Sequence, residues 1–157
     1  MFGILNTEEI EDLINTQLVG RLGCHADGLT YVVPISYAYD GESVYSLGFE
    51  GQKMDMMRKN PSVCFQVDNT NNLDNWQSVI AWGQFEELKD PNMRSEALKK
   101  LNQRKLPVII SERMHLTDQW PFVPENFDDI KGIVYRIHLT KKTGRYEKTI
   151  PGSFFAT

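Results

Sequence analysis

Two Asp-Gly pairs, at residues 27–28 and 40–41, constrain the fold of this chain more than any other feature of its sequence. A two-residue hairpin turn needs positive φ at its turn positions, which Asp-Gly tolerates well. Runs rich in β-branched and aromatic residues flank both pairs, at 21–26, 29–39 and 43–49. The pattern therefore predicts an antiparallel meander.

Helices are expected where apolar residues recur at helical spacing next to a capping residue. Asn6 or Thr7 is expected to cap the first helix, and Asp90 followed by Pro91 is typical of the start of the third. The expected helices cover 6–18, 51–60 and a segment that begins at 90.

The rest of the chain adds strands to the meander. Further strands are expected at 62–68, 77–88 and 132–139. Residues 69–75 are expected to form a polar loop and 141–146 a basic turn and tail, and Gly83 predicts a bend or a bulge. Residues 105–130 contain three prolines and no clean period, and we expect substrate specificity to lie there. Five or six antiparallel strands must hide their edges, and closure into a small β-barrel does that.

The composition favours one folded domain over residues 1–157, with no nucleic-acid or membrane partner. Hydrophobic residues make up 41% of the 157 residues and charged residues 24%, which argues against long disorder. The formal net charge is -4, whereas binders of nucleic acid or anionic membranes are usually basic. No signal peptide and no apolar membrane span is recognisable. Cys24 and Cys64 lie in apolar runs without CxxC spacing, so we expect buried reduced thiols in a cytoplasmic protein.

The segment 48–61, GFEGQKMDMMRKNP, gives the first indication of chemistry. A helix is expected to start at Gln52 and Lys53, and a helix start exposes unpaired N–H groups with partial positive charge. A lysine at that end is unfavourable by about 0.3–1 kcal/mol, unless an anion binds at the same place. The segment is therefore either a phosphate site or a surface helix with a solvated lysine.

Proline and aromatic residues point to two further candidate features. Pro34 cannot donate to a β-ladder, so it predicts an edge strand whose neighbouring N–H groups face a ligand, or an edge that is protected from aggregation. Trp76, Trp82 and Phe85 either line a flat apolar pocket or belong to the core or a dimer interface. Trp120 is similarly ambiguous.

The histidines do not indicate a metal site. His25, His115 and His138 lie far apart, without the spacing of a zinc motif. His25 precedes a hairpin turn and is the best placed of the three for a pocket, with a structural or surface role as the alternative. The chain has no GxSxG, no nucleotide P-loop and no GxGxxG, so Ser/His/Asp catalysis has no support.

Taken in order, three segments resemble the pyridoxamine-phosphate-oxidase-like flavoproteins, within the flavin-nucleotide-binding branch that includes nitroimidazole-resistance proteins. The segments are GRLGCHADGLTYVVPISYAYDG, VYSLGFEGQKMDMMRKNPSVCFQVD and WQSVIAWGQFEELKD, with a weaker match at 134–145. The resemblance implies a mainly β fold with flanking helices, an antiparallel split β-barrel that binds FMN at the interface of a homodimer.

The resemblance also implies which residues meet FMN. The stretch 33–36 matches the strand along the isoalloxazine ring, 46–48 the strand end beside the ribityl chain and phosphate, and 52–53 the phosphate clamp, where relatives often carry arginine in place of the glutamine. The expected cofactor-binding residues are Val33, Pro34, Ile35, Ser36, Ser46, Leu47, Gly48, Gln52, Lys53 and Ser78.

By the same resemblance we expect an oxidoreductase in which NADH or NADPH reduces FMN, which then reduces a small organic molecule, such as a nitro compound. No catalytic residue is assigned, although His25 is the candidate counterpart of a histidine near the ring in the resistance branch. Arg136 and Arg145 do not reproduce the substrate motif of true pyridoxamine phosphate oxidases, so vitamin B6 synthesis is not expected. A flavin-binding module without turnover and a haem-binding protein are the alternatives.

Overall fold

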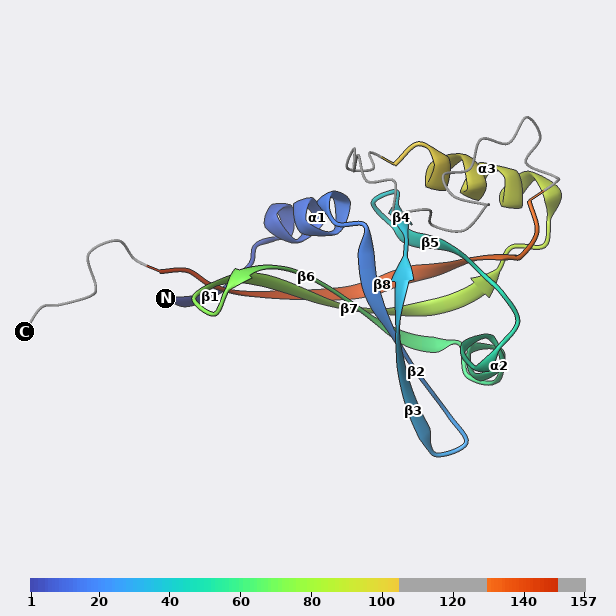
Figure 1. Ribbon diagram of the computed structural model, residues 1–157, viewed down its shortest axis with the longest axis horizontal. Coiled ribbons are helices and arrows are strands. Elements are labelled where there is room, and N and C mark those ends of the chain that lie inside the picture. Colours follow the sequence, from blue (N-terminus) through green and yellow to red (C-terminus); the bar gives the residue numbers. More distant parts are fainter. Residues whose placement is uncertain (105–129, 150–157) are drawn as a thin grey trace, which may run out of the picture.

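The chain folds into a strongly curved antiparallel sheet with helices around it, in a computed structural model that describes residues 1–104 and 130–149 (Figure 1). The strands are β1 (Phe2–Ile4), β2 (Val19–Ala26), β3 (Leu29–Ser36), β4 (Ala38–Tyr39), β5 (Ser43–Gly48), β6 (Ser62–Asn72), β7 (Asn75–Glu87) and β8 (Ile133–Glu147). The helices are α1 (Thr7–Thr16), α2 (Gln52–Lys59) and α3 (Pro91–Asn102). The strand order is β3-β2-β6-β7-β8-β5-β4, and β1 pairs with β8.

The two ends of this strand order meet, which closes the sheet into the predicted split barrel. β3 and β4 are the outermost strands of the order, yet only Tyr37 separates them in the sequence. The sheet must therefore curl until its edges lie together. A side-chain hydrogen bond crosses this closure. Ser46 Oγ of β5, the neighbour of β4, donates to the Ser36 carbonyl of β3 at 2.7 Å.

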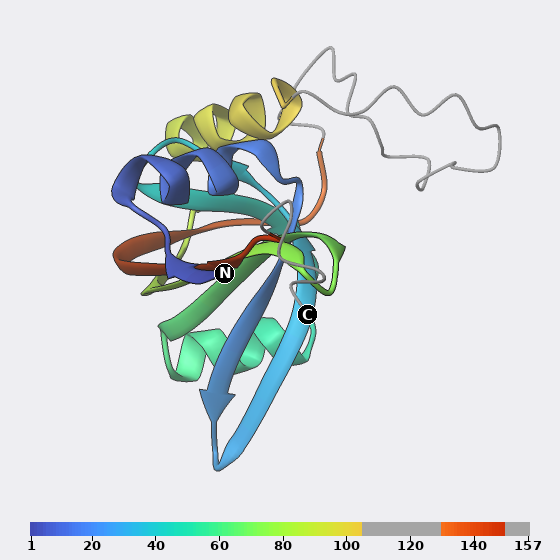
Figure 2. The ribbon, with the colours of Figure 1, turned by 90° about the vertical axis from the view of Figure 1, so that its left-hand side faces the viewer.

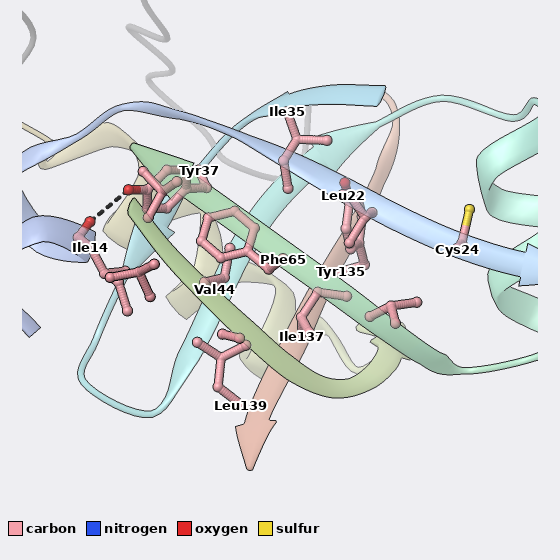
Figure 3. Close-up of a cluster of buried hydrophobic side chains, with 14 of the residues drawn as sticks. Ile14, Leu22, Cys24, Ile35, Tyr37, Val44, Phe65, Tyr135, Ile137 and Leu139 are labelled. Atoms are coloured by element: carbon pink, nitrogen blue, oxygen red, sulfur yellow. Dashed lines mark hydrogen bonds between the residues drawn. The ribbon is translucent and has the colours of Figure 1, made fainter. Parts of the chain in front are cut away.

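The barrel interior holds the main hydrophobic core, part of which is drawn in Figure 3. Tyr37 lies edge-on to Phe65, with ring centroids 5.0 Å apart, and its hydroxyl donates to the Ile14 carbonyl of α1 at 2.6 Å. A second, smaller cluster lies beneath α3. Figure 2 shows α1 and α3 on one side of the barrel and α2 on the other.

Two buried tyrosines offer a matched test of core hydrogen bonding. The Tyr135 hydroxyl is buried and forms no hydrogen bond of normal geometry among the described residues, although Ser46 lies opposite it on β5, and burial raises the pKa of Tyr135 to about 12. We expect Tyr135→Phe to leave the free energy of unfolding unchanged or to raise it, because a buried polar atom without a well-formed hydrogen bond is removed. Tyr37→Phe, which loses the bond to Ile14, should cost about 1–2 kcal/mol. Urea unfolding of both variants checks this, and an equal loss would show that the Tyr135 hydroxyl has a partner.

Local signals predicted several turns and caps correctly. Asp27 and Gly28 have φ of 52° and 77°, as the hairpin turn requires. Asn6 caps α1 in a capping box, since it accepts from the Glu9 N–H at 2.9 Å while the Glu9 carboxylate accepts from the Asn6 N–H at 2.8 Å. Asp90 caps α3 and Pro91 opens it, as expected. No helix in the described ranges is long and apolar enough to span a membrane.

Two segments that were predicted to be a loop and a turn lie mostly in strands. Residues 69–75 continue β6 to Asn72 and open β7 at Asn75, and 141–146 lie inside β8. Residues 69–74 are exposed and 141–146 are mostly buried or half-buried, and backbone pairing between β6, β7 and β8 holds both segments in strands. The first helix is also shorter than predicted, at 7–16, and the three-residue β1 was not predicted.

The bulge predicted at Gly83 is confirmed. Gly83 lies opposite Leu139 and Trp82 lies opposite Lys141, so Thr140 is an extra residue in β8. A Cβ atom on Gly83 would lie 2.1 Å from the His138 carbonyl oxygen. Glycine is therefore required at the bulge in the pairing of β7 with β8, the two longest strands.

Candidate functional site

The corner between β5 and α2 brings together the residues expected to hold a phosphate. β5 ends at Gly48, and α2 starts at Gln52 with Gly51 as its N-cap. No described side chain caps this end, and the first helical backbone bond runs from Asp55 N–H to the Gly51 carbonyl at 3.1 Å. The earlier N–H groups therefore stay open to a ligand at the positive end of the helix.

Lys53 lies in the first turn of α2 and its side chain folds over the end of β5. A Cβ atom on Gly48 would come within 3.3 Å of both Cε and Nζ of Lys53 and within 2.9 Å of Met54 Cε, so the glycine leaves room for the lysine. The ammonium group is half-buried, and burial lowers the pKa of Lys53. An anion bound beside the ammonium would offset this cost of burial.

Two carboxylates near α2 are bonded to other cations, whereas Asp55 in its first turn forms no ion pair with Lys53. Glu50 accepts two hydrogen bonds from Arg58, at 2.7 and 2.9 Å. Asp27 is bonded to Lys59 at 2.6 Å. In the part of the chain that the structure describes, no carboxylate forms an ion pair with Lys53. The Lys53 ammonium is thus left without a carboxylate partner, so it can pair with an external anion.

β3 is an outermost strand of the sheet, as Pro34 predicts. Pro34 and Ser36 are exposed on its outer face, whereas Ile35 is buried in the barrel core and Val33 packs against that core. Of the stretch expected along a flavin ring, only Pro34 and Ser36 can therefore present side chains to a ligand on the outer face. The other two residues can contribute backbone groups.

The predicted residues of β5 point in different directions. Ser46 is buried at the closure of the barrel, where it bonds to β3. Leu47 packs into the cluster beneath α3, so its side chain faces away from the corner. Gly48 is the residue of β5 that adjoins Lys53, and Gln52 is exposed at the helix start.

Ser78 lies in a different place, on the outer face of β7. Its hydroxyl accepts a hydrogen bond from Gln66 Nε2 at 3.1 Å, and the same amide donates to Asp68 at 3.2 Å. Arg21 contacts Asp68 at 3.1 Å and lies opposite Pro34 in the pairing of β2 with β3. This polar row from β7 to β3 was not predicted. Polar residues at alternate positions of apolar strands are the signal that could have found it.

The histidines are separate in the structure. His25 is exposed on β2, with Nδ1 3.0 Å from Thr30 Oγ1, and His138 Nδ1 is 3.4 Å from Ser43 Oγ. His115 and Trp120 lie outside the described residues, as does most of the segment expected to carry specificity. Among the described residues, no three metal-binding side chains gather in one place.

Trp76, Trp82 and Phe85 do not form one pocket wall. Phe85 packs against Tyr135 in the core, with ring centroids 5.6 Å apart. Trp76 donates to Glu147 at 3.0 Å near the far end of the β6–β7 hairpin. Trp82 is exposed on the outer face of β7. The core interpretation is confirmed for Phe85.

Comparison with known proteins agrees with this fold. The family described as pyridoxamine 5'-phosphate oxidase matches residues 6–146. A FAD-binding protein of Mesorhizobium loti is 30% identical over 94% of this chain and 99% of its own, with a TM-score of 0.73. A candidate 5-nitroimidazole antibiotic resistance protein of Bacteroides thetaiotaomicron is 18% identical over 93% of this chain and 87% of its own, with a TM-score of 0.70. At that identity the likeness concerns the fold.

The match over residues 6–146 settles the family. The chain belongs to the pyridoxamine 5'-phosphate oxidase family. An uncharacterised protein of Rhizobium meliloti is 35% identical over 85 residues, which cover 54% of this chain and 56% of that protein. The match thus spans little more than half of the length of this curated relative.

Proposed function

We propose that this protein binds FMN and works as an oxidoreductase, which passes a hydride from NADH or NADPH to a small organic acceptor such as a nitro compound. When bound, FMN supplies the redox chemistry of that transfer. The observation that carries the proposal is the half-buried Lys53 beside the uncapped start of α2. FMN ends in a phosphate, and lysine and helix N-termini both bind phosphate.

The residues of the corner fit this ligand in distinct ways. Lys53 and the first N–H groups of α2 bind the phosphate, and Gly48 keeps the space beside the ammonium free of a side chain. Pro34 and the backbone of β3 present an outer surface to the ring, since β3 pairs with β2 alone and forms no backbone ladder on its other side. Ser36 adds an exposed hydroxyl at the end of the same strand.

FMN is proposed rather than FAD, because the corner offers one lysine and one helix start, which suit a single terminal phosphate. The relative from Mesorhizobium loti is described as FAD-binding, so both flavins belong in the same titration. Fluorescence quenching with FMN and FAD should show tighter binding of FMN. Tighter binding of FAD would contradict the choice of flavin, and binding of neither would contradict the proposal.

The outer face of the sheet supports a homodimer with the flavin along its seam. Val32, Gly23, Cys64 and Trp82 form one row across β3, β2, β6 and β7. Val32 is 62% exposed and Trp82 39%. Ile80 lies in the next row and is 39% exposed. Exposed apolar side chains gathered on one sheet face are typical of an interaction surface, and we propose that a second copy of this chain covers it.

A charge in this row should break the dimer. We expect wild-type protein to have twice the 18.1 kDa mass of one chain, and Val32→Glu to reduce it to the mass of a monomer, because the carboxylate would be buried without a partner. Light scattering after size exclusion measures this. Leu73→Glu is the control, since Leu73 is exposed at the turn between β6 and β7. A monomeric wild type, or a dimeric Val32→Glu variant, contradicts the interface.

The state of the two cysteines indicates in which cellular compartment the protein folds. Cys24 is buried as expected, whereas Cys64 is only half-buried, on the outer face, and neither forms a disulfide. Free thiols persist in a reducing cytoplasm, and a cytoplasmic location is part of the proposal.

A flavin-binding module without turnover is the second candidate. It is favoured by the described corner itself, where the titratable neighbour of Lys53 is the Cys24 thiol, whose pKa burial raises, and no carboxylate forms an ion pair with Lys53 among the described residues. Steady-state consumption of NADH and NADPH with several acceptors separates the two functions. Sustained turnover supports the oxidoreductase, and flavin binding with no turnover supports the module. A Soret band in the purified protein would instead indicate the haem-binding alternative.

A further inference from the structure

The end of β3 is fixed from several sides. The Ser36 carbonyl accepts a hydrogen bond from Ser46 Oγ at 2.7 Å, and the Tyr37 N–H donates to the Leu18 carbonyl at 3.1 Å. The Ser36 side chain itself is exposed, on the same face as Pro34. A short, anchored backbone thus presents one hydroxyl to the outside at the strand expected along a flavin ring.

Arg104 reaches this point from the end of α3. Its Nε donates to the Leu101 carbonyl at 2.8 Å, and its Nη1 donates to Ser36 Oγ at 2.5 Å and to the Tyr37 carbonyl at 3.1 Å. Burial lowers the pKa of Arg104 to about 10, so the guanidinium is still charged at neutral pH. Residues 68 positions apart in the sequence are therefore joined by a charge-assisted hydrogen bond.

The chemistry of this bond decides where the hydroxyl hydrogen points. A guanidinium has donors and no acceptor, so Ser36 Oγ must be the acceptor. The hydrogen of Ser36 is then left for another partner, because Ser36 Oγ donates no hydrogen bond within the part of the chain that the structure describes. A hydroxyl that accepts from a cation is also a stronger donor, because successive hydrogen bonds polarise one another.

We propose that Arg104 is a positioning residue for the flavin ring and acts through Ser36, whose hydroxyl donates to an acceptor atom on the polar edge of the ring. This inference rests on the proposed function. The acceptor atoms of the ring carry more negative charge in reduced FMN than in oxidised FMN, so a polarised donor binds the reduced form more tightly. The pair of side chains thus raises the reduction potential of the bound flavin.

A double-mutant cycle tests the proposal. Ser36→Ala and Arg104→Gln should each weaken binding of reduced FMN about tenfold more than binding of oxidised FMN, which equals a fall of about 30 mV in midpoint potential for a two-electron couple. The double variant should fall no further, because each single change already removes the same hydrogen bond to the ring. Spectroelectrochemical titration measures the potential, and fluorescence quenching measures the affinity for oxidised FMN.

Conservative and distant variants serve as controls. Ser36→Thr keeps the hydroxyl and Arg104→Lys keeps a charged donor. The midpoint potential of bound FMN in both variants should therefore lie closer to that of the wild type than in Ser36→Ala and Arg104→Gln. Lys99→Gln removes one charge from α3 where the lysine pairs with Glu96 at 3.0 Å, and should leave the potential unchanged.

Three outcomes overturn the inference while the wild type still binds FMN. These are unchanged potentials in both single variants, equal weakening of reduced and oxidised FMN, and additive losses in the double variant. Ser36→Ala alters an exposed side chain, so it decides the matter even if Arg104→Gln does not fold. Failure of the wild type to bind FMN would instead contradict the proposed function.

Discussion

We expect Lys53→Met to weaken FMN binding by about 1–3 kcal/mol, or roughly 5- to 150-fold in Kd, which is the range for a lost hydrogen bond to a charged group. Methionine retains the apolar stem that packs over Gly48 and removes the ammonium beside the start of α2. The loss should therefore come from the phosphate contact and not from the fold. Fluorescence quenching in an FMN titration gives the two Kd values.

Lys59→Met is the matched control on the same helix. Lys59 lies in the last turn of α2, is exposed, and forms an ion pair with Asp27 at 2.6 Å. We expect its FMN affinity to equal that of the wild type. Equal losses in both variants would indicate a general charge effect, and no loss in Lys53→Met would show that the corner does not bind the phosphate.

Gly83→Ala should be among the most destabilising single substitutions in this chain, at about 3–5 kcal/mol. The new methyl group would lie 2.1 Å from the His138 carbonyl oxygen and 2.8 Å from its carbonyl carbon. These are backbone atoms of the paired strand, so no side chain can move aside. The bulge between β7 and β8 would have to rearrange, and these strands make the longest pairing in the sheet. Urea unfolding measures the loss.

Gly23→Ala tests whether the steric contact is the cause. Gly23 is also in a strand interior, but a Cβ atom there has its nearest neighbours, Cys64 Cβ and the Cys64 carbonyl oxygen, at 3.7 Å. We expect a change within about 1 kcal/mol, of either sign. If Gly23→Ala loses as much stability as Gly83→Ala, crowding at the His138 carbonyl is not the reason.

The parts of the fold that were predictable depend on short stretches of sequence. Asp27 and Gly28 supply the φ values of a turn by themselves, and Asn6 with Glu9 completes a capping box within one helical turn. The full length of β8 was not predictable in this way. Its polar second half at 141–146 is held by pairing with β7, and such pairing depends on the register of strands distant in sequence.

The same difference separates the candidate site residues. The corner that contains Lys53 was predictable because strand end, turn and helix start follow one another within a few residues, whereas Gly48 was assigned from the family resemblance. The contact between Arg104 and Ser36 was not predictable, because it requires α3 to lie over the closure of the barrel. The side chain of Ile35 points into the barrel core and that of Leu47 into the cluster beneath α3, and a match of segments does not indicate either direction.

Comparison of FMN with riboflavin tests the central claim most directly, because the two ligands differ only in the phosphate. If Lys53 and the first N–H groups of α2 hold that phosphate, the wild type should bind FMN about 100-fold more tightly than riboflavin, the sum of two charged hydrogen bonds at the low end of their range. In Lys53→Met this ratio should shrink while riboflavin binding stays the same. Equal affinity of the wild type for FMN and riboflavin would contradict a phosphate site at this corner.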